Sequence, residues 1–524
     1  MTWSKLCRRL DLNLALVVLL SVFAFAPLAY PGFFQSHSGF LPVFHLYDLE
    51  GGLWSNWGWV PHLAASPNLL TGEGAVPYMV AESLRWLALD GVQAIKGVYG
   101  LGFVVSGLAA YLLGKRMFGA AGGLLAAVVY VYAPFHLATV YVRGAFAEAW
   151  AFSLYPLTLL CWDLYLRDRR ILWAASGVLA YAALASTSLG LALIYAIFIL
   201  AFVLAAGAPR GAKLHALLLL AAGLGLALAL QVPSAVRYGL PSFSDTGFTE
   251  HFIYPFQLLS SSWGYGTSVQ GWKDTLPLQL GLAATGLTIV AGLLLAGQRR
   301  SIPQVVRTAG FFVAATAVMV LLLLQPASAL WQASRLSLTM RYPWQLLSLV
   351  AFAMSMASAA IIRLEPRLER LPWQAVLVSL VILESYGYLT PRFTDVRVGG
   401  SPVAVLGDEA MLLSYEREGP LRHGATVRVT LHWQGLRPME TDYTVFVHVV
   451  DEQGTIWAQG DSMPVGGERP TSTWQMGEIV EDRYEVTIDV EGPREGYVVE
   501  IGLYDQASGT RLPLSSGATA ITLE

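Results

Sequence analysis

Long apolar runs occupy most of the chain and set its expected architecture. A helix that crosses a bilayer needs about 20 mostly apolar residues, and runs of this kind recur from residue 11 to residue 390. They predict about eleven membrane spans, at residues 11–30, 93–113, 117–135, 146–166, 171–187, 189–207, 214–235, 277–297, 306–325, 343–362 and 373–390. The first run follows a basic head, and we interpret it as a retained helix rather than a signal peptide.

The last part of the chain has a different pattern. Apolar and polar residues alternate over 426–433, 443–450 and 497–504, and turn-forming residues separate these segments. Alternation with a period of two, interrupted by regular turns, is typical of an antiparallel β-sandwich. The sequence therefore predicts a polytopic α-helical membrane domain at residues 1–395 and a β-sandwich domain at residues 396–524.

Positive charge is unevenly distributed over the connectors between the predicted spans. Clusters of Lys and Arg occupy every second connector, at Lys5 to Arg9, Lys115-Arg116, Arg167 to Arg170, Arg210 to Lys213, Arg299 to Arg307 and Arg363 to Arg370. Such connectors face the cytoplasm in membrane proteins. We therefore expect a multi-pass protein of the cell membrane with a cytoplasmic N-terminus and an extracytoplasmic β-sandwich. The large external loops are then residues 31–91, 237–276 and 326–342.

The composition agrees with a chain that lies mostly in lipid. Of its 524 residues, 55% are hydrophobic and 13% are charged, and the mean hydropathy is +0.53. Soluble proteins have about 25% charged residues. The net charge of −3 gives no basic surface for nucleic acid. The two cysteines, Cys7 and Cys161, lie in the predicted cytoplasmic tail and in a predicted span. Neither is placed to form a disulfide, bind a metal or act as a nucleophile.

Ionisable side chains at the outer end of the fourth predicted span are the strongest candidates for chemistry, because charge is costly at membrane depth. Arg143 lies at the external mouth of this span, and Glu148 lies more than one helical turn inside it. A guanidinium there suits a phosphate group, which it holds with paired N–H donors. The alternatives are an arginine that extends to the lipid headgroups and a Glu148 that only pairs with Arg143 or a tyrosine.

The first external loop contains a second group of candidates. Apolar residues recur among polar ones over residues 43–53, which predicts a helix lying in the membrane interface. His45 and Asp48 are three residues apart, on one face of such a helix, and suit a metal site or a general base. The alternative is two polar residues on the wet face of this helix. The loop also has tryptophans that are candidates for stacking on sugar rings or for interfacial anchoring: Trp54, Trp57 and Trp59.

The later external loops add groups that form hydrogen bonds. In the second loop, His251, Gln257, Trp263 and Asp274 are candidate substrate contacts, with ordinary loop structure as the alternative. In the third loop, Arg341 opens the tenth predicted span from outside and is a candidate for binding an anionic lipid phosphate, with simple anchoring as the alternative. The sequence has no convincing glycine-rich nucleotide loop, Ser/His/Asp arrangement or Cys/His zinc spacing.

Several stretches together resemble a family of bacterial multi-span proteins labelled 6-pyruvoyl-tetrahydropterin-synthase-related, which is similar to the GT-C superfamily of membrane glycosyltransferases. The resemblance covers about residues 1–395. It rests on Ser38-Gly39 with His45, Tyr130 to Phe135, Tyr141 to Glu148, His251 with Gln257, Trp263 to Gly266 with Asp274, and Arg341 to Trp344. The predicted β-sandwich resembles a domain appended to some of these proteins.

The resemblance implies transfer of a sugar from a polyprenyl-phosphate carrier to a glycan or protein acceptor on the extracytoplasmic face. A carboxylate of the first loop would act as the base, often with a divalent metal ion such as Mg or Mn nearby. This chain has Ser38-Gly39 where relatives tend to carry Asp-Gly, and Ser186-Thr187-Ser188 where relatives often place a histidine. The candidate bases are therefore Asp48, Glu148 and Glu50.

Three hypotheses on function follow. The preferred one is a GT-C-type glycosyltransferase in which Arg143 and Arg341 hold the lipid phosphate. The second is a non-catalytic protein of the same architecture that binds or assembles lipid-linked glycans, and it is favoured by Ser38. The third is a transporter or flippase. Against it, the polar candidates cluster outside the membrane rather than near the bilayer midplane.

Overall fold

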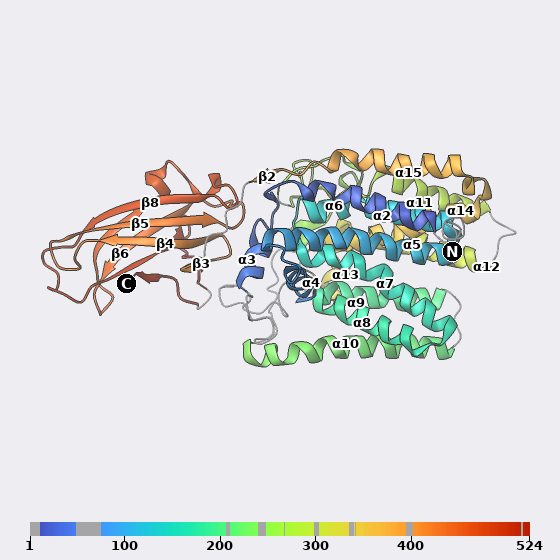
Figure 1. The fold of residues 1–524 in the computed structure, drawn as a ribbon, viewed down its shortest axis with the longest axis horizontal. Coiled ribbons are helices and arrows are strands. Elements are labelled where there is room, and N and C mark those ends of the chain that lie inside the picture. The colour runs from blue at the N-terminus through green and yellow to red at the C-terminus, as the bar shows by residue number, and fades with distance from the viewer. Residues whose placement is uncertain are drawn as a thin grey trace. The chain divides into compact units, whose positions relative to one another are not determined.

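The protein consists of two compact units (Figure 1). Its computed structural model describes residues 11–48, 75–205, 210–238, 248–266, 268–297, 303–334, 340, 342–394, 402–514 and 517–523. Unit 1 comprises Met1–Tyr30 and Glu73–Pro391, and unit 2 comprises Pro31–Gly72 and Arg392–Glu524.

Unit 1 is a bundle of apolar helices. Its helices are α2 Leu12–Phe25, α4 Ala75–Arg85, α5 Gly91–Val131, α6 Pro134–Tyr141, α7 Phe146–Asp168, α8 Ile171–Thr187, α9 Leu189–Ala205, α10 Arg210–Tyr238, α11 Leu282–Gly297, α12 Pro303–Leu323, α13 Ser328–Ser334, α14 Leu347–Leu364 and α15 Leu371–Ser385. Each of the eleven predicted spans overlaps one of them. Within the described residues, five helices are long and apolar enough to cross a membrane, and three shorter apolar ones accompany them. A helix satisfies its own backbone groups, as lipid requires.

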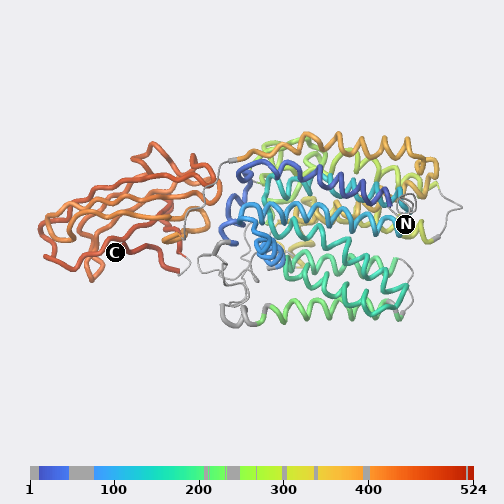
Figure 2. The backbone as a smooth tube through the Cα atoms, in the orientation of Figure 1, coloured from blue at the N-terminus to red at the C-terminus, as the bar shows by residue number. Residues whose placement is uncertain are grey.

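Helix α5 is a helical hairpin rather than one continuous helix. Gly119 has φ +86° and ψ 173°, which interrupts the helix and which glycine adopts without steric cost. Beyond it the chain runs back along itself, so that a Cβ atom at Gly114 would lie 2.8 Å from the Cβ atom of Ala126. The two halves correspond to the predicted spans 93–113 and 117–135. Figure 2 shows α2, in dark blue, and α15, in orange, in the same bundle. The ring of Phe23 in α2 stacks on that of Tyr386, which directly follows α15, at 6.3 Å.

Several of the basic connectors meet at one end of this bundle. Lys115 Nζ lies 2.5 Å from Asp11 Oδ2. Arg116 pairs with Asp163, and Arg167 Nε lies 3.2 Å from the same carboxylate. The predicted grouping of these connectors on one side is therefore visible in the contacts, whereas the identity of that side as cytoplasmic stays a prediction.

Unit 2 contains two four-stranded antiparallel sheets, with the strand orders β10-β9-β6-β7 and β3-β4-β5-β8. Their strands are β3 Ala404–Leu406, β4 Ala410–Glu418, β5 Thr426–Gly435, β6 Tyr443–Val450, β7 Ile456–Ser462, β8 Ile479–Thr487, β9 Val498–Asp505 and β10 Ile521–Leu523. Alternate residues of β5 and β6 enter a shared apolar core, among them Val429, Leu431, Trp433, Val447 and Val449. The predicted fold class, a helical membrane protein with a C-terminal antiparallel β domain, is confirmed.

The segment that follows the first membrane helix belongs to unit 2. Strand β1, Phe33–Phe34, pairs with β2, Phe393–Thr394, and α3 spans Leu41–Asp48. Helix α3 overlaps the helix that we predict near residues 43–53. The interfacial position does not hold for the part of it that the structure describes, because residues 41–46 are all buried. The predicted boundary at residues 395 and 396 stays a prediction, and the division by contacts differs from it in assigning residues 31–72 to unit 2.

We expect Asp163→Asn to destabilise the helix bundle. Asp163 is 8% exposed and accepts hydrogen bonds from Arg116 and Arg167. Its removal therefore leaves the partly buried guanidinium of Arg116 without its counter-charge. The expected loss is about 2 kcal/mol of unfolding free energy, measured by thermal or denaturant unfolding in detergent. Glu365→Gln is the control, because its partner Arg367 is exposed and 3.9 Å away. Equal stability of the two variants would contradict the assignment.

Candidate functional site

The turn between α6 and α7 fixes the backbone of Arg143. The N–H of Arg143 donates to the carbonyl of Ala138 at 2.8 Å, which uses one of the last free carbonyls of α6. The hydroxyl of Tyr99, from α5, donates to the carbonyl of Gly144 at 2.7 Å. The arginine therefore lies on a tightly held turn at the end of the bundle opposite to Asp163.

An ion pair joins Arg143 to the first turn of α7. Its Nη1 lies 2.5 Å from Oε2 of Glu148. The partial positive charge of a helix N-terminus stabilises a carboxylate in that position. The side-chain amide of Gln345 donates to Oε1 of the same carboxylate. Both oxygens of Glu148 are thus hydrogen bonded, one by a cation and one by an amide.

Aromatic rings surround the guanidinium. Its carbon lies 4.5 Å from the ring centroid of Trp344 and 5.7 Å from that of Phe135, distances at which a cation is attracted to a ring face. Tyr342 stacks on Trp344 at 4.8 Å, and the ring of His251 meets Tyr342 edge-on at 4.6 Å. We call these residues, with Glu148 and Gln345, the Arg143 cluster.

The guanidinium keeps hydrogen-bonding capacity. Arg143 is 9% exposed, and a guanidinium carries five N–H donors. Within the described part of the chain, Glu148 is the one hydrogen-bond acceptor of this side chain. The remaining donors are suited to an anion with several oxygens, such as a phosphate.

Three members of the cluster come from the segment that opens the tenth predicted span, where the sequence identifies Arg341 as a candidate but not Gln345. Tyr342, Trp344 and Gln345 lie at the 3-10 helix Pro343–Leu346, which opens α14. The Gln345 side chain accepts from the N–H of Tyr342 at 3.0 Å. Glutamine three residues after the helix boundary, with proline at the first helical position, is the recognisable signal for this arrangement.

Gln257 and Asp274 form a separate pair in the second external loop. The amide of Gln257 donates to Asp274 Oδ2 at 2.7 Å, and the N–H of Leu276 donates to Oδ1 at 2.8 Å. Burial raises the pKa of Asp274 to about 6, although both hydrogen bonds oppose that rise. Trp263 stacks on Tyr388 at 4.3 Å. Among the described contacts, none joins these residues to the Arg143 cluster.

The remaining candidates belong to the first and third external loops. His45 is 1% exposed, and burial lowers the pKa of His45 to about 3, so its imidazole is neutral. Asp48 is the last residue of α3, and its side chain lies outside the described residues, as do Glu50, Trp57 and Arg341. In the described ranges, no group of three His, Cys, Asp or Glu side chains could hold a metal ion. A metal site at His45 and Asp48 stays a prediction.

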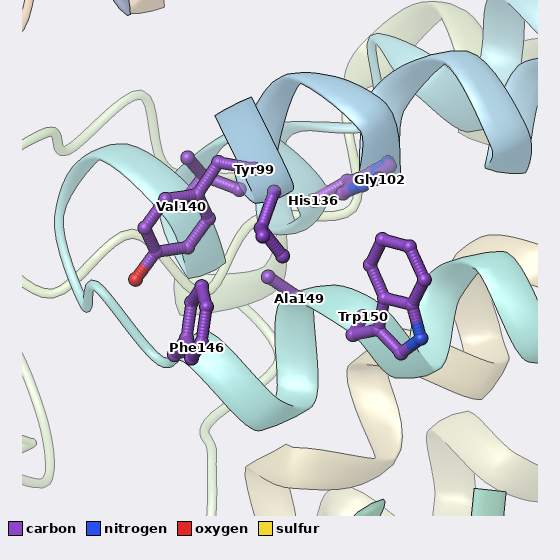
Figure 3. Close-up of a pocket in the computed structure, with 8 residues that line it drawn as sticks. Tyr99, Gly102, His136, Val140, Phe146, Ala149 and Trp150 are labelled. Atoms are coloured by element: carbon purple, nitrogen blue, oxygen red, sulfur yellow. The ribbon is translucent and has the colours of Figure 1, made fainter. Parts of the chain in front are cut away.

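A small pocket lies among α5, α6 and α7 (Figure 3). It is lined by Val98, Tyr99, Gly102, His136, Val140, Phe146, Ala149 and Trp150. Two polar side chains of this lining are engaged by the backbone, since Tyr99 donates to Gly144 and His136 Nδ1 lies 3.0 Å from the carbonyl of Tyr130. The lining is therefore mostly apolar.

The fold is similar to that of one solved membrane glycosyltransferase, and two others align with lower scores. The arabinofuranosyltransferase AftD from Mycobacteria aligns with a TM-score of 0.50 at 16% identity, over 72% of this chain and 27% of the AftD chain. The Archaeoglobus fulgidus oligosaccharyltransferase gives 0.43 at 15% identity, over 72% and 54% of the two chains. ArnT from Cupriavidus metallidurans gives 0.33 at 14% identity, over 71% and 77%.

The chain thus spans about a quarter of the length of AftD, and at 16% identity the similarity concerns the fold alone. No protein-family model matches the sequence, and no curated protein matches it. The chain is a membrane protein with a GT-C-like fold and a C-terminal β domain.

We expect Asp274 to make the stability of the protein depend on pH. Its pKa is about 6 when folded and about 4 in an unfolded chain. The folded state therefore binds this proton more tightly, so the carboxyl group favours folding at low pH. The advantage is lost as the pH rises from about 4 to about 6.

The measurement is the melting temperature of wild type and Asp274→Asn across this range. The difference between the two should move in favour of the variant as the pH rises. Ser261→Ala, at an exposed position of the same loop, is the control. Serine does not titrate in this range, so the difference of this variant from wild type should stay constant. A constant difference for Asp274→Asn as well would refute the expectation.

Proposed function

We propose that the protein is a glycosyltransferase that moves a sugar from a polyprenyl-phosphate carrier to an acceptor hydroxyl on the extracytoplasmic face of the membrane. The observation that carries the proposal is the Arg143 guanidinium. It is largely buried at a helix end and contacts Glu148 and Trp344. Several of its N–H donors remain available for a ligand. The GT-C-like fold supports the reaction class. The sequence motifs support membership of the 6-pyruvoyl-tetrahydropterin-synthase-related family.

In the proposed reaction, the bond between the anomeric carbon and the phosphate oxygen breaks, and its electron pair leaves with the polyprenyl phosphate. Negative charge grows on that phosphate as the bond lengthens. Arg143 stabilises it through charge-assisted hydrogen bonds, and Arg341 is the candidate second cation. Cations fixed in place before the reaction lower the barrier, because they need no reorganisation when the charge develops.

The acceptor supplies the other half of the reaction. Its hydroxyl oxygen forms the new bond to the anomeric carbon, and its proton passes to a carboxylate. Glu148 is poorly suited to receive it, because both of its oxygens already accept hydrogen bonds from Arg143 and Gln345. We therefore assign the role to Asp48 first, with Glu50 as the next candidate in the same loop. A divalent ion, Mg or Mn, at His45 and Asp48 is a further proposal that these steps do not use.

The other candidate residues would contact the substrates. The hydrogen bond of Gln257 to Asp274 and the stacking of Trp263 on Tyr388 give the second loop a fixed shape, which suits a wall of a binding site. His251 is part of the Arg143 cluster through Tyr342. Trp57 is the candidate for stacking on a sugar. The apolar surface of the helices would receive the polyprenyl tail from the surrounding lipid.

A second function is favoured by one observation. Ser38 stands where relatives tend to carry an aspartate, and serine is a poor base without a partner. The chain would then bind lipid-linked glycans, or assist their assembly, without turnover. Tight binding of the carrier with no transfer would support this alternative.

We expect Arg143→Ala to lower turnover about 100- to 1000-fold, as the loss of one group that stabilises transition-state charge does elsewhere. Arg143→Lys should fall in between, because lysine keeps the charge but loses the planar fork. Asp48→Ala should also lower turnover. The measurement is transfer from a labelled polyprenyl-phosphate sugar by purified protein.

Arg367→Ala is the matched control, since this side chain is 83% exposed at the opposite end of the bundle. It should leave turnover unchanged. Equal turnover of wild type, Arg143→Ala and Asp48→Ala would reject the assignment of the site.

We expect a reporter fused after residue 524 to lie outside the cytoplasm, because the charge pattern places the β domain there. Alkaline phosphatase fused at this position should be active, and a green fluorescent protein exported through the same pathway should be dark. The opposite result would place the Arg143 cluster on the cytoplasmic side and would contradict the use of an external acceptor.

A further inference from the structure

The start of the first external loop pairs through its backbone with the segment that precedes the β domain. Strand β1 pairs with β2 in antiparallel register, with Phe33 opposite Thr394 and Phe34 opposite Phe393. The N–H of Gln35 then donates to the carbonyl of Arg392 at 2.7 Å. The loop thus continues a small sheet whose second strand leads into the β domain.

A second attachment lies at Gly39. The N–H of Phe40 donates to the carbonyl of Leu436 at 2.7 Å, just after strand β5. Gly39 has φ +52°, and a Cβ atom on it would lie 2.4 Å from the oxygen of Leu436 and 2.6 Å from the Cα of Arg437. The two backbones therefore touch at a distance that only glycine permits.

The segment that Gly39 contacts, Leu436 and Arg437, is itself held in place. The N–H of Leu436 donates to the carbonyl of Glu409 at 2.9 Å. The side chains of Arg437 and Glu409 form a paired interaction, with Arg437 Nε 3.1 Å from Glu409 Oε2. The loop is thus attached to a rigid corner of the sheet rather than to a flexible turn.

Burial adds to the two attachments. The side chains of residues 33–46 that are less than 2% exposed include Phe33, Phe34, Phe40, Val43 and Leu46. Removing this much apolar surface from water holds a segment firmly. The N-terminal end of helix α3 is therefore held in place, and Asp48 is the last residue of this helix.

We propose that the β-sandwich is the scaffold that positions the first external loop for catalysis, with Gly39 as a positioning residue that acts through Asp48. This inference rests on the proposed function, in which Asp48 receives the proton of the acceptor. The sandwich is then an integral part of the transfer machinery. Proton transfer demands a donor–acceptor distance of about 2.6–3.2 Å, so a loop without this anchor would carry its carboxylate out of reach.

Gly39→Ala tests the anchor in the full-length protein. The control is Gly454→Ala, because Gly454 has φ +79° and a Cβ atom on it would meet nothing within 4 Å. The control therefore carries similar backbone strain without the collision. Hydrogen exchange should accelerate at Gln35 and Phe40 in Gly39→Ala, and should be unchanged in β6 and at Arg143. Unchanged exchange at Gln35 and Phe40 would overturn the anchor.

Kinetics test the link to Asp48. Gly39→Ala should lower kcat at least about tenfold while the KM for the carrier stays the same, because the carrier phosphate is bound at Arg143 in unit 1. In an Asp48→Ala background, Gly39→Ala should have no further effect, since it acts through a group already removed. A full additional loss in that background, or normal kcat with a loosened loop, would overturn the positioning role.

A cleavage experiment keeps the inference testable if Gly39→Ala does not fold. A protease site inserted between residues 395 and 401 of the otherwise wild-type chain separates the two parts covalently after folding. The sandwich should remain bound to the helical domain, and its release would overturn the anchor. If the wild type transfers no sugar at all, the proposed function fails, and exchange and cleavage still decide whether the sandwich holds the loop.

Discussion

The cost of placing charge in hydrocarbon is the constraint on which the rest of the structure depends. Asp163 gathers Arg116 and Arg167 at one end of the helix bundle, and Glu148 holds Arg143 at the other. Between these ends the helices are apolar and their backbone groups bond within each helix. The cost of buried charge therefore restricts the charged side chains of the bundle to its two ends. One of them contains the candidate site.

Within that site, Glu148 and Trp344 both act on the guanidinium of Arg143. A guanidinium that is 9% exposed would be unstable without a counter-charge, and Glu148 supplies it. The carboxylate also reduces the net charge that an incoming phosphate meets. In the proposed reaction, the carrier lipid leaves after giving up its sugar, and a site that bound its phosphate with an unpaired cation would slow that release. The ring of Trp344, 4.5 Å from the guanidinium carbon, adds a cation–π attraction that helps to hold the side chain in place.

The sequence reveals the features of the fold that depend on neighbouring residues. Spans follow from runs of apolar residues, and the β-sandwich follows from alternation in strands such as β5 and β6. Contacts between distant segments cannot be predicted in this way. Gln345 bonds Glu148 across 197 positions, and nothing near either residue indicates its partner. The polar residues of α3 suggest a wet face when the sequence is considered alone, whereas His45 is 1% exposed in the structure.

The attachment of the first external loop must form late in assembly, because its two sides lie far apart in the sequence. Residues 33–40 leave the first membrane helix early, but their partners at Phe393, Thr394 and Leu436 follow the last one. The loop cannot reach its final position until every span is inserted and the sheet has closed around Leu436. Contacts of such high sequence separation form late, since a long chain must be closed before they are made. The candidate base Asp48 can therefore take its final position only after the whole chain has been made. Pairing confined to the loop itself would not impose this order.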